Sequence, residues 1–438
     1  MGPLLSPAGS LDGFQPHPLR LFGLPAARGR WLLLPLGAVA HLCMGTVYAW
    51  SVFRQPLEQA LGLGATQSLL PYTVALLCYA LVMPVGGQLL PRLGPRRLML
   101  LGAVVIALGY LLASRSQTIG QLVLTYGVIV GSGVGLAYGV PLAVAARWFP
   151  ERQGLAIGLV VVGFGLSPLI TAPLAHRLIV SQGLGVTLQL LGVAFLVFMV
   201  VVALAMALPP PGWRPPISPH RPNSAAHAAG QAPASAVAAG SPPQASPTAA
   251  LLRSRSFWGL WLCYSLGALL GLSAIGISSQ VGLEVIAIDP ALAASSISLF
   301  AVFNGASRPL FGWLSDRLRP SRVATLAYLL VLVGSLMMAR AGEGDLLTYL
   351  VAFSLFWASL GAWLAIAPAA TLRCFDPERY AQTYGLVFTA YGAGALLGTL
   401  ITGQLRDWLG SYSGAFLPMA AVASVGIVLA HVLLRPGR

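Results

Sequence analysis

One arginine within a long apolar stretch is the residue of this sequence best suited to bind a negatively charged ligand. Arg308 lies in the run Ser295–Leu314, which is long and apolar enough to cross a membrane. A guanidinium near the middle of a span costs about 2.5–3.5 kcal/mol on insertion scales, so it needs an anion, a carbonyl group or water beside it. Two roles are therefore open for Arg308: contact with an anionic substrate, or a structural bond to carbonyl groups of the opposite half of the fold.

Polar and aromatic side chains inside the apolar runs are candidates to complete such a site. Asn304 precedes Arg308 by four residues, so the two side chains share one face of a helix. Asn304 either orients the guanidinium and contacts the ligand, or links neighbouring helices. Tyr48, Tyr138 and Trp363 lie well inside their runs, where they either line a cavity or fill the core.

The distribution of reactive residues argues against catalysis. All eleven acidic residues lie outside the middle of the apolar runs, and His41 and His431 are isolated. An enzyme inside the membrane would need a nucleophile–base pair or metal ligands at depth. The four cysteines lack the spacing of a metal or redox site. The sequence thus predicts no enzyme, no metal and no cofactor, and the missing carboxylate disfavours a cationic substrate.

The composition is that of a multi-pass membrane protein. Hydrophobic residues make up 57% of the 438 residues and charged residues 8%, and the mean hydropathy is +0.81. Twelve apolar runs are expected to be helices, because backbone polar groups in lipid must be bonded within their own segment. These runs are Trp31–Phe53, Ser68–Leu90, Leu98–Ala113, Gln121–Ala146, Gly154–Leu178, Val186–Leu208, Phe257–Ile277, Ser295–Leu314, Val323–Ala339, Leu346–Leu372, Thr383–Leu405 and Gly414–Leu434.

The charge pattern predicts the orientation of these spans in the lipid bilayer. The net charge is +14 and all 25 basic residues are arginines. Apart from Arg308 they lie in the tails, the linker and short loops rather than on one face, which argues against nucleic acid as a partner. If the N-terminus is cytoplasmic, 19 arginines face the cytoplasm and five face the outside. We therefore expect both termini in the cytoplasm.

The spans fall into two equal groups separated by a polar linker. Residues 209–255 are rich in Pro, Ala, Ser and Gln and cannot bury a core, so they are predicted to be disordered. We accordingly predict a cytoplasmic tail (1–30), a first six-helix bundle (31–208), the linker (209–255), a second six-helix bundle (256–434) and a short cytoplasmic tail (435–438).

The two groups of spans repeat each other in sequence. The loop beginning at Gly87 shares Gly, Leu, Arg, Leu, Pro and Arg with the loop beginning at Gly312. The segment Arg147–Arg152 corresponds to Arg373–Arg379 with one inserted residue, and both copies of each motif fall at equal depth. This is the pattern of a parallel repeat, in which a substrate binds near the midplane between the halves.

The repeated motifs resemble those of the major facilitator superfamily. The loop at Gly312 is similar to the signature between the eighth and ninth helices of that superfamily. More narrowly, four motifs resemble the oxalate–formate antiporter family, which overlaps with bacterial monocarboxylate transporters; they are Gly45–Phe53, Gly131–Tyr138, Arg147–Ala156 and Asn304–Arg308. The resemblance implies an all-α membrane protein with twelve transmembrane helices in two parallel six-helix repeats. It also implies alternating access, a bacterial-type inner membrane and a functional monomer.

The resemblance further implies a gate built from the two repeated loops. Its residues would be Gly87, Arg92, Arg97, Gly312, Asp316, Arg317 and Arg322. Pro91 stands where the first loop of the family usually has Asp, so Asp316 alone is expected to carry the charge of this conformational latch.

One departure from the family favours a singly charged substrate. In the oxalate-transporting member, a Lys on the eleventh helix joins the Arg of the eighth helix to neutralise a dianion, and Tyr391 stands at that position here. With Arg308 as the one cation, a dianion would keep an unpaired charge in the cavity at a cost of several kcal/mol. The sequence thus favours monocarboxylates such as formate, lactate or pyruvate, with Tyr391 as a hydrogen-bond donor. A dicarboxylate antiporter and a membrane sensor remain the alternatives.

Overall fold

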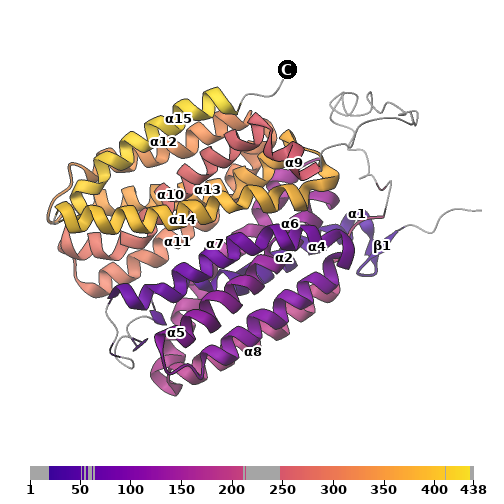
Figure 1. Cartoon of the computed structure of the whole chain (residues 1–438), viewed down its shortest axis with the longest axis horizontal. Helices are drawn as coiled ribbons and strands as arrows, with labels where there is room; N and C mark the ends of the chain where they lie inside the picture. Colours follow the sequence, from indigo (N-terminus) through magenta and orange to yellow (C-terminus); the bar gives the residue numbers. More distant parts are fainter. Residues whose placement is uncertain are drawn as a thin grey trace, which may run out of the picture.

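The apolar runs form a bundle of long helices, because each helix satisfies its own backbone hydrogen bonds and leaves apolar side chains outside. Figure 1 shows the chain as a computed structural model. The structure describes residues 19–50, 52–53, 56–57, 62, 65–210, 213, 247–409 and 411–434.

The first half begins with a short hairpin and continues as helices. Its elements are β1 (Arg20–Leu21), β2 (Leu24–Pro25), α1 (Ala26–Gly29), η1 (Arg30–Leu32), α2 (Leu33–Met44), η2 (Gly45–Ala49), α4 (Ala65–Ala113), α5 (Ile119–Leu122), the π-helix η3 (Val123–Val130), α6 (Gly131–Trp148), α7 (Gln153–Gln182) and α8 (Leu184–Ala205).

The second half is also helical. Its elements are α9 (Pro247–Leu252), α10 (Arg255–Glu284), α11 (Pro290–Arg317), α12 (Pro320–Met338), α13 (Leu346–Cys374), η4 (Pro377–Arg379), α14 (Tyr380–Leu409), η5 (Tyr412–Ala415) and α15 (Phe416–Leu433).

The helices match the expected spans, with two informative differences. By length and composition, nine helical stretches of the described residues can cross a membrane. One of them, inside α4, is divided at Gly94, where φ of 73° and ψ of 167° interrupt the helix and separate two of the predicted spans. The other two long helices, α11 and α14, are more polar, because they contain several Ser, Thr, Asn, Gln, Asp and Arg residues.

Part of the predicted linker is ordered. Helix α9 falls within residues 209–255, and its Leu251 packs against the hydrophobic core, so this part is helical rather than disordered. Leu21 of the hairpin, inside the predicted tail, also packs against the core. Residues 1–18, 214–246 and 435–438 lie outside the described residues. The disorder predicted for 214–246 and the two predicted tails at these ends therefore stay predictions.

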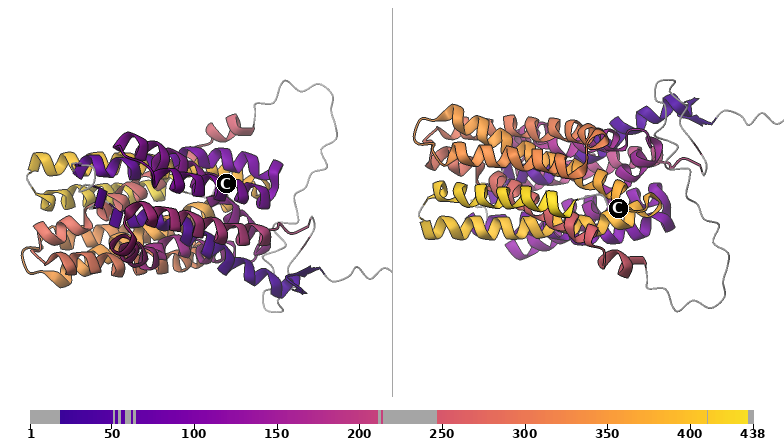
Figure 2. Two further views of the ribbon diagram at one scale, coloured as in Figure 1. Left: turned by 90° about the horizontal axis from the view of Figure 1, so that it is seen from below. Right: turned by 90° about the horizontal axis from the view of Figure 1, so that it is seen from above.

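The two halves lie side by side, and their ends are distinct. Helices of residues 19–205 occupy one side of the molecule and those of residues 247–434 the other (Figure 1), and two further views agree (Figure 2). Elements β1, α1 and α9 lie at one end and α5 at the opposite end. We call the first the basic end, because turns at this end contain Arg92–Arg97, Arg147–Arg152, Arg317–Arg322 and Arg373–Arg379.

Two helix pairs make the most extensive contacts between the halves, and each is built on a close backbone approach. Helix α7 packs on α11, which we call the first seam, and α14 packs on α4, the second seam. At the first seam, a Cβ on Gly312 would collide with the carbonyl of Gly154. At the second seam, a Cβ on Gly87 would collide with the carbonyl of Ala381. The repeated glycines thus let both seams close at the basic end.

We expect Gly312→Ala to destabilise the protein, because the added methyl group must push the α7 backbone away. Such overpacking costs about 1–3 kcal/mol. The measurement is the thermal unfolding temperature in detergent, with Gly342→Ala as control, since a Cβ on Gly342 meets nothing within 4 Å. Equal unfolding temperatures for both variants would show that the seam is not closely packed.

Candidate functional site

Arg308 lies at the first seam and connects the two halves. Its side chain is fully buried on α11. Nη1 donates a hydrogen bond of 2.8 Å to the carbonyl of Val161 on α7, and Nη2 donates one of 2.8 Å to Oδ1 of Asn304. The structural role foreseen for this arginine, a bond to a carbonyl of the opposite half, is therefore present in this conformation.

Asn304 holds the guanidinium in place. Its Nδ2 donates to the carbonyl of Trp357 on α13 at 2.8 Å while its Oδ1 accepts from Arg308. The carbonyl can only accept and the guanidinium can only donate, so these two partners determine which way the amide points. Gly361 on α13 makes room for this arrangement, because a Cβ there would collide with the backbone of Asn304.

The guanidinium retains one unused donor. Nε of Arg308 has no hydrogen-bond partner among the described residues, and the backbone of Gly165 lies against it. The centre of the guanidinium lies 5.7 Å from the ring centroid of Phe164. The described polar contacts of Arg308 are thus with neutral acceptors, and its positive charge is balanced by dipoles and an aromatic face.

A pair of tyrosines makes a second polar link between the halves. The hydroxyl groups of Tyr48 on η2 and Tyr391 on α14 lie 2.5 Å apart. The ring of Tyr48 also packs edge-on against Phe164 at 5.0 Å, and its hydroxyl lies within electrostatic range of Arg308. Tyr391 therefore already has a hydrogen-bond partner in this conformation.

The other two predicted binding residues occupy different surroundings. Tyr138 packs against Phe164 at 5.6 Å and lies within electrostatic range of Arg308, so it belongs to the central group. Trp363 packs between Tyr264 and Tyr328 inside the second half. The structure thus places Arg308, Tyr48 and Tyr138 against Phe164. Asn304 and Tyr391 join this group through hydrogen bonds to Arg308 and Tyr48, whereas Trp363 packs inside the second half.

Two site residues were missing from the sequence-based set. Val161 contributes a backbone carbonyl, which no side-chain pattern reveals. Phe164 was detectable, because Phe164–Gly165 corresponds in the internal repeat to Tyr391–Gly392.

Asp316 links the halves at the basic end. Its Oδ1 accepts a hydrogen bond from the backbone N–H of Gly154 at 2.7 Å, and its Oδ2 accepts from that of Leu155 at 2.9 Å. Both donors belong to the first turn of α7, so a carboxylate of one half caps a helix of the other. Burial raises the pKa of Asp316, while the two N–H donors and then Arg373 and Arg152 oppose this shift.

The remaining gate residues are not partners of Asp316. Arg317 lies over the ring of Trp313 at 4.0 Å, and Arg92 and Arg97 are exposed. Gly87 and Gly312 lie at the two seams, and Arg322 is exposed at the start of α12.

Arg373 and Arg147 were missing from the predicted gate. Arg373 donates to the carbonyls of Ser315 and Leu318 at the end of α11. Arg147 reaches across the halves to the carbonyl of Glu378 at 3.2 Å. The repeated segments identified in the sequence contain both arginines, so the motif could have indicated them. Within the described residues, no group of three His, Cys, Asp or Glu side chains could hold a metal ion.

Comparison with known proteins places this architecture in one family. The model of the Major Facilitator Superfamily matches residues 36–372 and, in a second alignment, residues 270–438. The chain belongs to the Major Facilitator Superfamily. Its fold is therefore that of twelve transmembrane helices in two six-helix repeats, and it is a multi-pass membrane protein of a transporter family.

Several superfamily members resemble the chain along most of its length. The oxalate:formate antiporter of Oxalobacter formigenes is 24% identical over 93% of this chain and 93% of its own. Monocarboxylate transporter 13 of Bos taurus is 29% identical over 78% of this chain and 74% of its own. The crystal structure of the superfamily transporter FucP in the outward conformation aligns with a TM-score of 0.67 at 16% identity, covering 92% of this chain and 98% of that one.

We expect Asp316→Asn to open the basic end. The amide can accept from one N–H of α7 but turns its own N–H₂ towards the other, which costs about 1–2 kcal/mol, the value of a helix cap. That is a factor of about 5–30 in the population of open molecules. The measurement is the thiol-labelling rate of a Ser315→Cys reporter, buried near the seam, in protein without its native cysteines.

The control for this variant is Asp345→Asn, since Asp345 accepts from the N–H of Gly342 within a single turn of one half.

Because burial raises the pKa of Asp316, acidification should protonate this carboxylate at a higher pH than an ordinary one. Labelling of the parent reporter should therefore increase as the pH falls. The Asn variant should have lost this response. Equal labelling of both proteins at every pH would contradict a latch at Asp316.

Proposed function

We propose that the protein carries small monocarboxylates, such as formate, lactate or pyruvate, across a membrane by alternating access, with Arg308 as the residue that binds the carboxylate. The observation that carries this proposal is a fully buried guanidinium whose described polar partners are neutral. A buried cation that lacks a compensating charge is a favourable place for an anion.

The geometry supports a binding step that involves both halves. Arg308 belongs to the second half, whereas the carbonyl of Val161 belongs to the first. A carboxylate can take the place of that carbonyl as the acceptor of Nη1, while Asn304 continues to hold Nη2. Binding would then replace a contact between the halves by a contact with the substrate, as alternating access requires.

Charge placement supports an orientation with the basic end in the cytoplasm, as the positive-inside rule expects. We propose a bacterial-type inner membrane and a functional monomer. The oxalate:formate antiporter and the monocarboxylate transporters among the similar proteins support a carboxylate as the substrate class.

The choice between mono- and dicarboxylates depends on Tyr391. This residue offers a hydroxyl group where the oxalate-transporting family member is expected to have a cation, so Arg308 alone balances one negative charge. Exchange of a dicarboxylate for formate remains the second candidate, because the oxalate:formate antiporter aligns with 93% of the chain. In that case a proton or a second cation must accompany the extra charge.

We expect Arg308→Gln to reduce carboxylate uptake by proteoliposomes on the order of a hundredfold or more, because a desolvated charge pair is lost. Arg308→Lys should recover little of it, since an ammonium group lacks the planar fork that matches a carboxylate. Arg177→Gln is the control, an exposed arginine at the other end of α7. Uptake by Arg308→Gln at the rate of the Arg177→Gln control would end this assignment.

We expect the wild-type protein to exchange formate, lactate or pyruvate in preference to oxalate, because one guanidinium neutralises one charge. Tyr391→Lys should shift the preference towards dicarboxylates, whereas Tyr391→Phe removes the hydroxyl without adding charge and should not. The measurement is counterflow in proteoliposomes with a panel of mono- and dicarboxylates. Wild-type exchange of oxalate at the rate of lactate would refute the argument from a single cation.

A further inference from the structure

Four buried tyrosines surround one phenylalanine between the halves. The rings of Tyr79 on α4, Tyr138 on α6, Tyr264 on α10 and Tyr384 on α14 lie 4.8, 5.4, 6.1 and 5.8 Å from the ring of Phe388. Each of the four is at most 2% exposed. Two come from the first half and two from the second, so this tyrosine cluster spans the interface through which a substrate would pass.

The hydroxyl groups of the cluster are unused donors. None of the four has a hydrogen-bond partner among the described residues. The rings of Tyr79 and Tyr138 pack against each other within the first half, with centroids 5.1 Å apart. The hydroxyls of Tyr138, Tyr264 and Tyr384 also lie within electrostatic range of Arg308. Tyrosines from four helices therefore meet at Phe388, and three of them lie close to the carboxylate site.

The packing of these rings does not explain their hydroxyl groups. A buried hydroxyl without a partner destabilises a fold, whereas phenylalanine fills the same space without that penalty. Four such groups in one cluster are best explained by a partner that is present during part of the working cycle. Phenol hydroxyls donate strongly to carboxylate oxygens, and a carboxylate has enough lone pairs to accept from all four.

We propose that the tyrosine cluster of Tyr79, Tyr138, Tyr264 and Tyr384 is a second carboxylate site, which the substrate occupies next to the site at Arg308. This inference rests on the proposed function. The site is neutral, so it holds an anion by hydrogen bonds alone and more weakly than a guanidinium does. Sites along a transport path must bind tightly enough to admit the substrate and weakly enough to release it.

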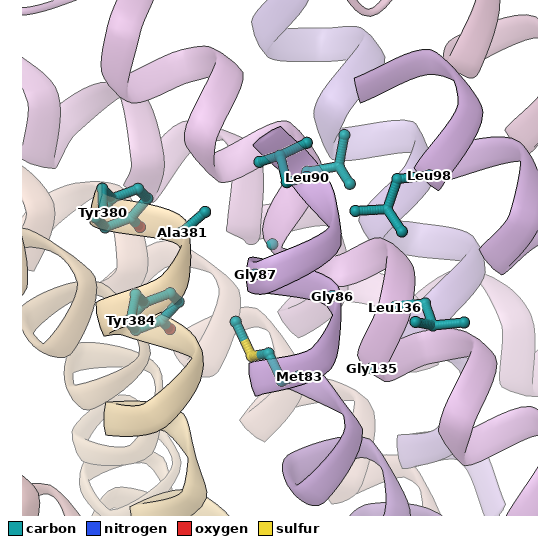
Figure 3. Close-up of a pocket in the computed structure, with 12 residues that line it drawn as sticks. Met83, Gly86, Gly87, Leu90, Leu98, Gly135, Leu136, Tyr380, Ala381 and Tyr384 are labelled. Atoms are coloured by element: carbon teal, nitrogen blue, oxygen red, sulfur yellow. The ribbon is translucent and has the colours of Figure 1, made fainter. Parts of the chain in front are cut away.

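The structure continues from the cluster towards the basic end. Tyr380 and Tyr384 stack one turn apart on α14, with ring centroids 5.6 Å apart, and both face α4 near Met83 and Gly87 (Figure 3). These residues line a narrow cavity of about 10 Å³, room for about one water molecule. Tyr380 and Tyr391 are eleven residues apart on this helix, a rise of roughly 16 Å. The second seam thus presents hydroxyl groups along its length.

The test compares tyrosine-to-phenylalanine variants in the full-length protein. In Tyr264→Phe/Tyr384→Phe, we expect the maximal rate of lactate counterflow to fall about tenfold, equivalent to one or two hydrogen bonds. The concentration of external lactate for half-maximal rate should change less than about twofold if Arg308 still makes the first contact. The unfolding temperature should stay constant or rise, because unpaired buried hydroxyls are removed.

The matched control is Tyr126→Phe, since the hydroxyl of Tyr126 is also buried and without a described partner but its ring packs on Trp50 and Tyr110 inside the first half. This control should transport lactate at the wild-type rate. A double variant that matches the control in rate overturns the second site and leaves the proposed function intact. A wild-type protein that exchanges no carboxylate overturns both.

Discussion

The burial of one guanidinium without an acidic partner is the constraint on which the rest of this structure depends. Arg308 is fully inaccessible and donates to a backbone carbonyl and to an amide. Neutral acceptors offset only part of the free energy that is lost when a cation leaves water. The fold can therefore bury the Arg308 guanidinium, and the guanidinium still favours an anion beside it. Asn304 is needed because it holds the guanidinium, and Val161 is needed because its carbonyl comes from the other half.

The internal repeat explains how one such site arises in a molecule of two similar halves. At the offset that relates Gly87 to Gly312, Arg308 corresponds to Met83 and Asp316 corresponds to Pro91. The glycine contacts that close the seams are thus present in both copies, whereas the charges are present in one. The first seam therefore contains the charged residues Arg308 and Asp316, whereas the second seam contains tyrosine hydroxyl groups.

Much of the fold and part of the site could be predicted from the sequence. Arg308 was recognisable because a charge within an apolar run is costly, and the spans were recognisable by length. The bond between Tyr48 and Tyr391 joins residues 343 positions apart, so only the tertiary structure reveals it. The partners of Asp316 are backbone N–H groups, which have no sequence signature. Trp363 packs between Tyr264 and Tyr328, which the sequence could not indicate, because buried aromatic residues look alike whether they line a cavity or fill a core.

In the proposed function, the positions of Arg308 and Asp316 on one helix connect substrate binding to the closure of the basic end. Both contact α7, Arg308 through the carbonyl of Val161 and Asp316 through the first turn. A carboxylate that replaces the carbonyl of Val161 removes one of the polar contacts that hold α11 against α7, and the cap at Asp316 must then hold the seam with fewer contacts. Rigid helices transmit such a change, because their packed interfaces have discrete arrangements rather than continuous ones. In the proposed function, the charge that selects the substrate is therefore also part of the contact that binding must break.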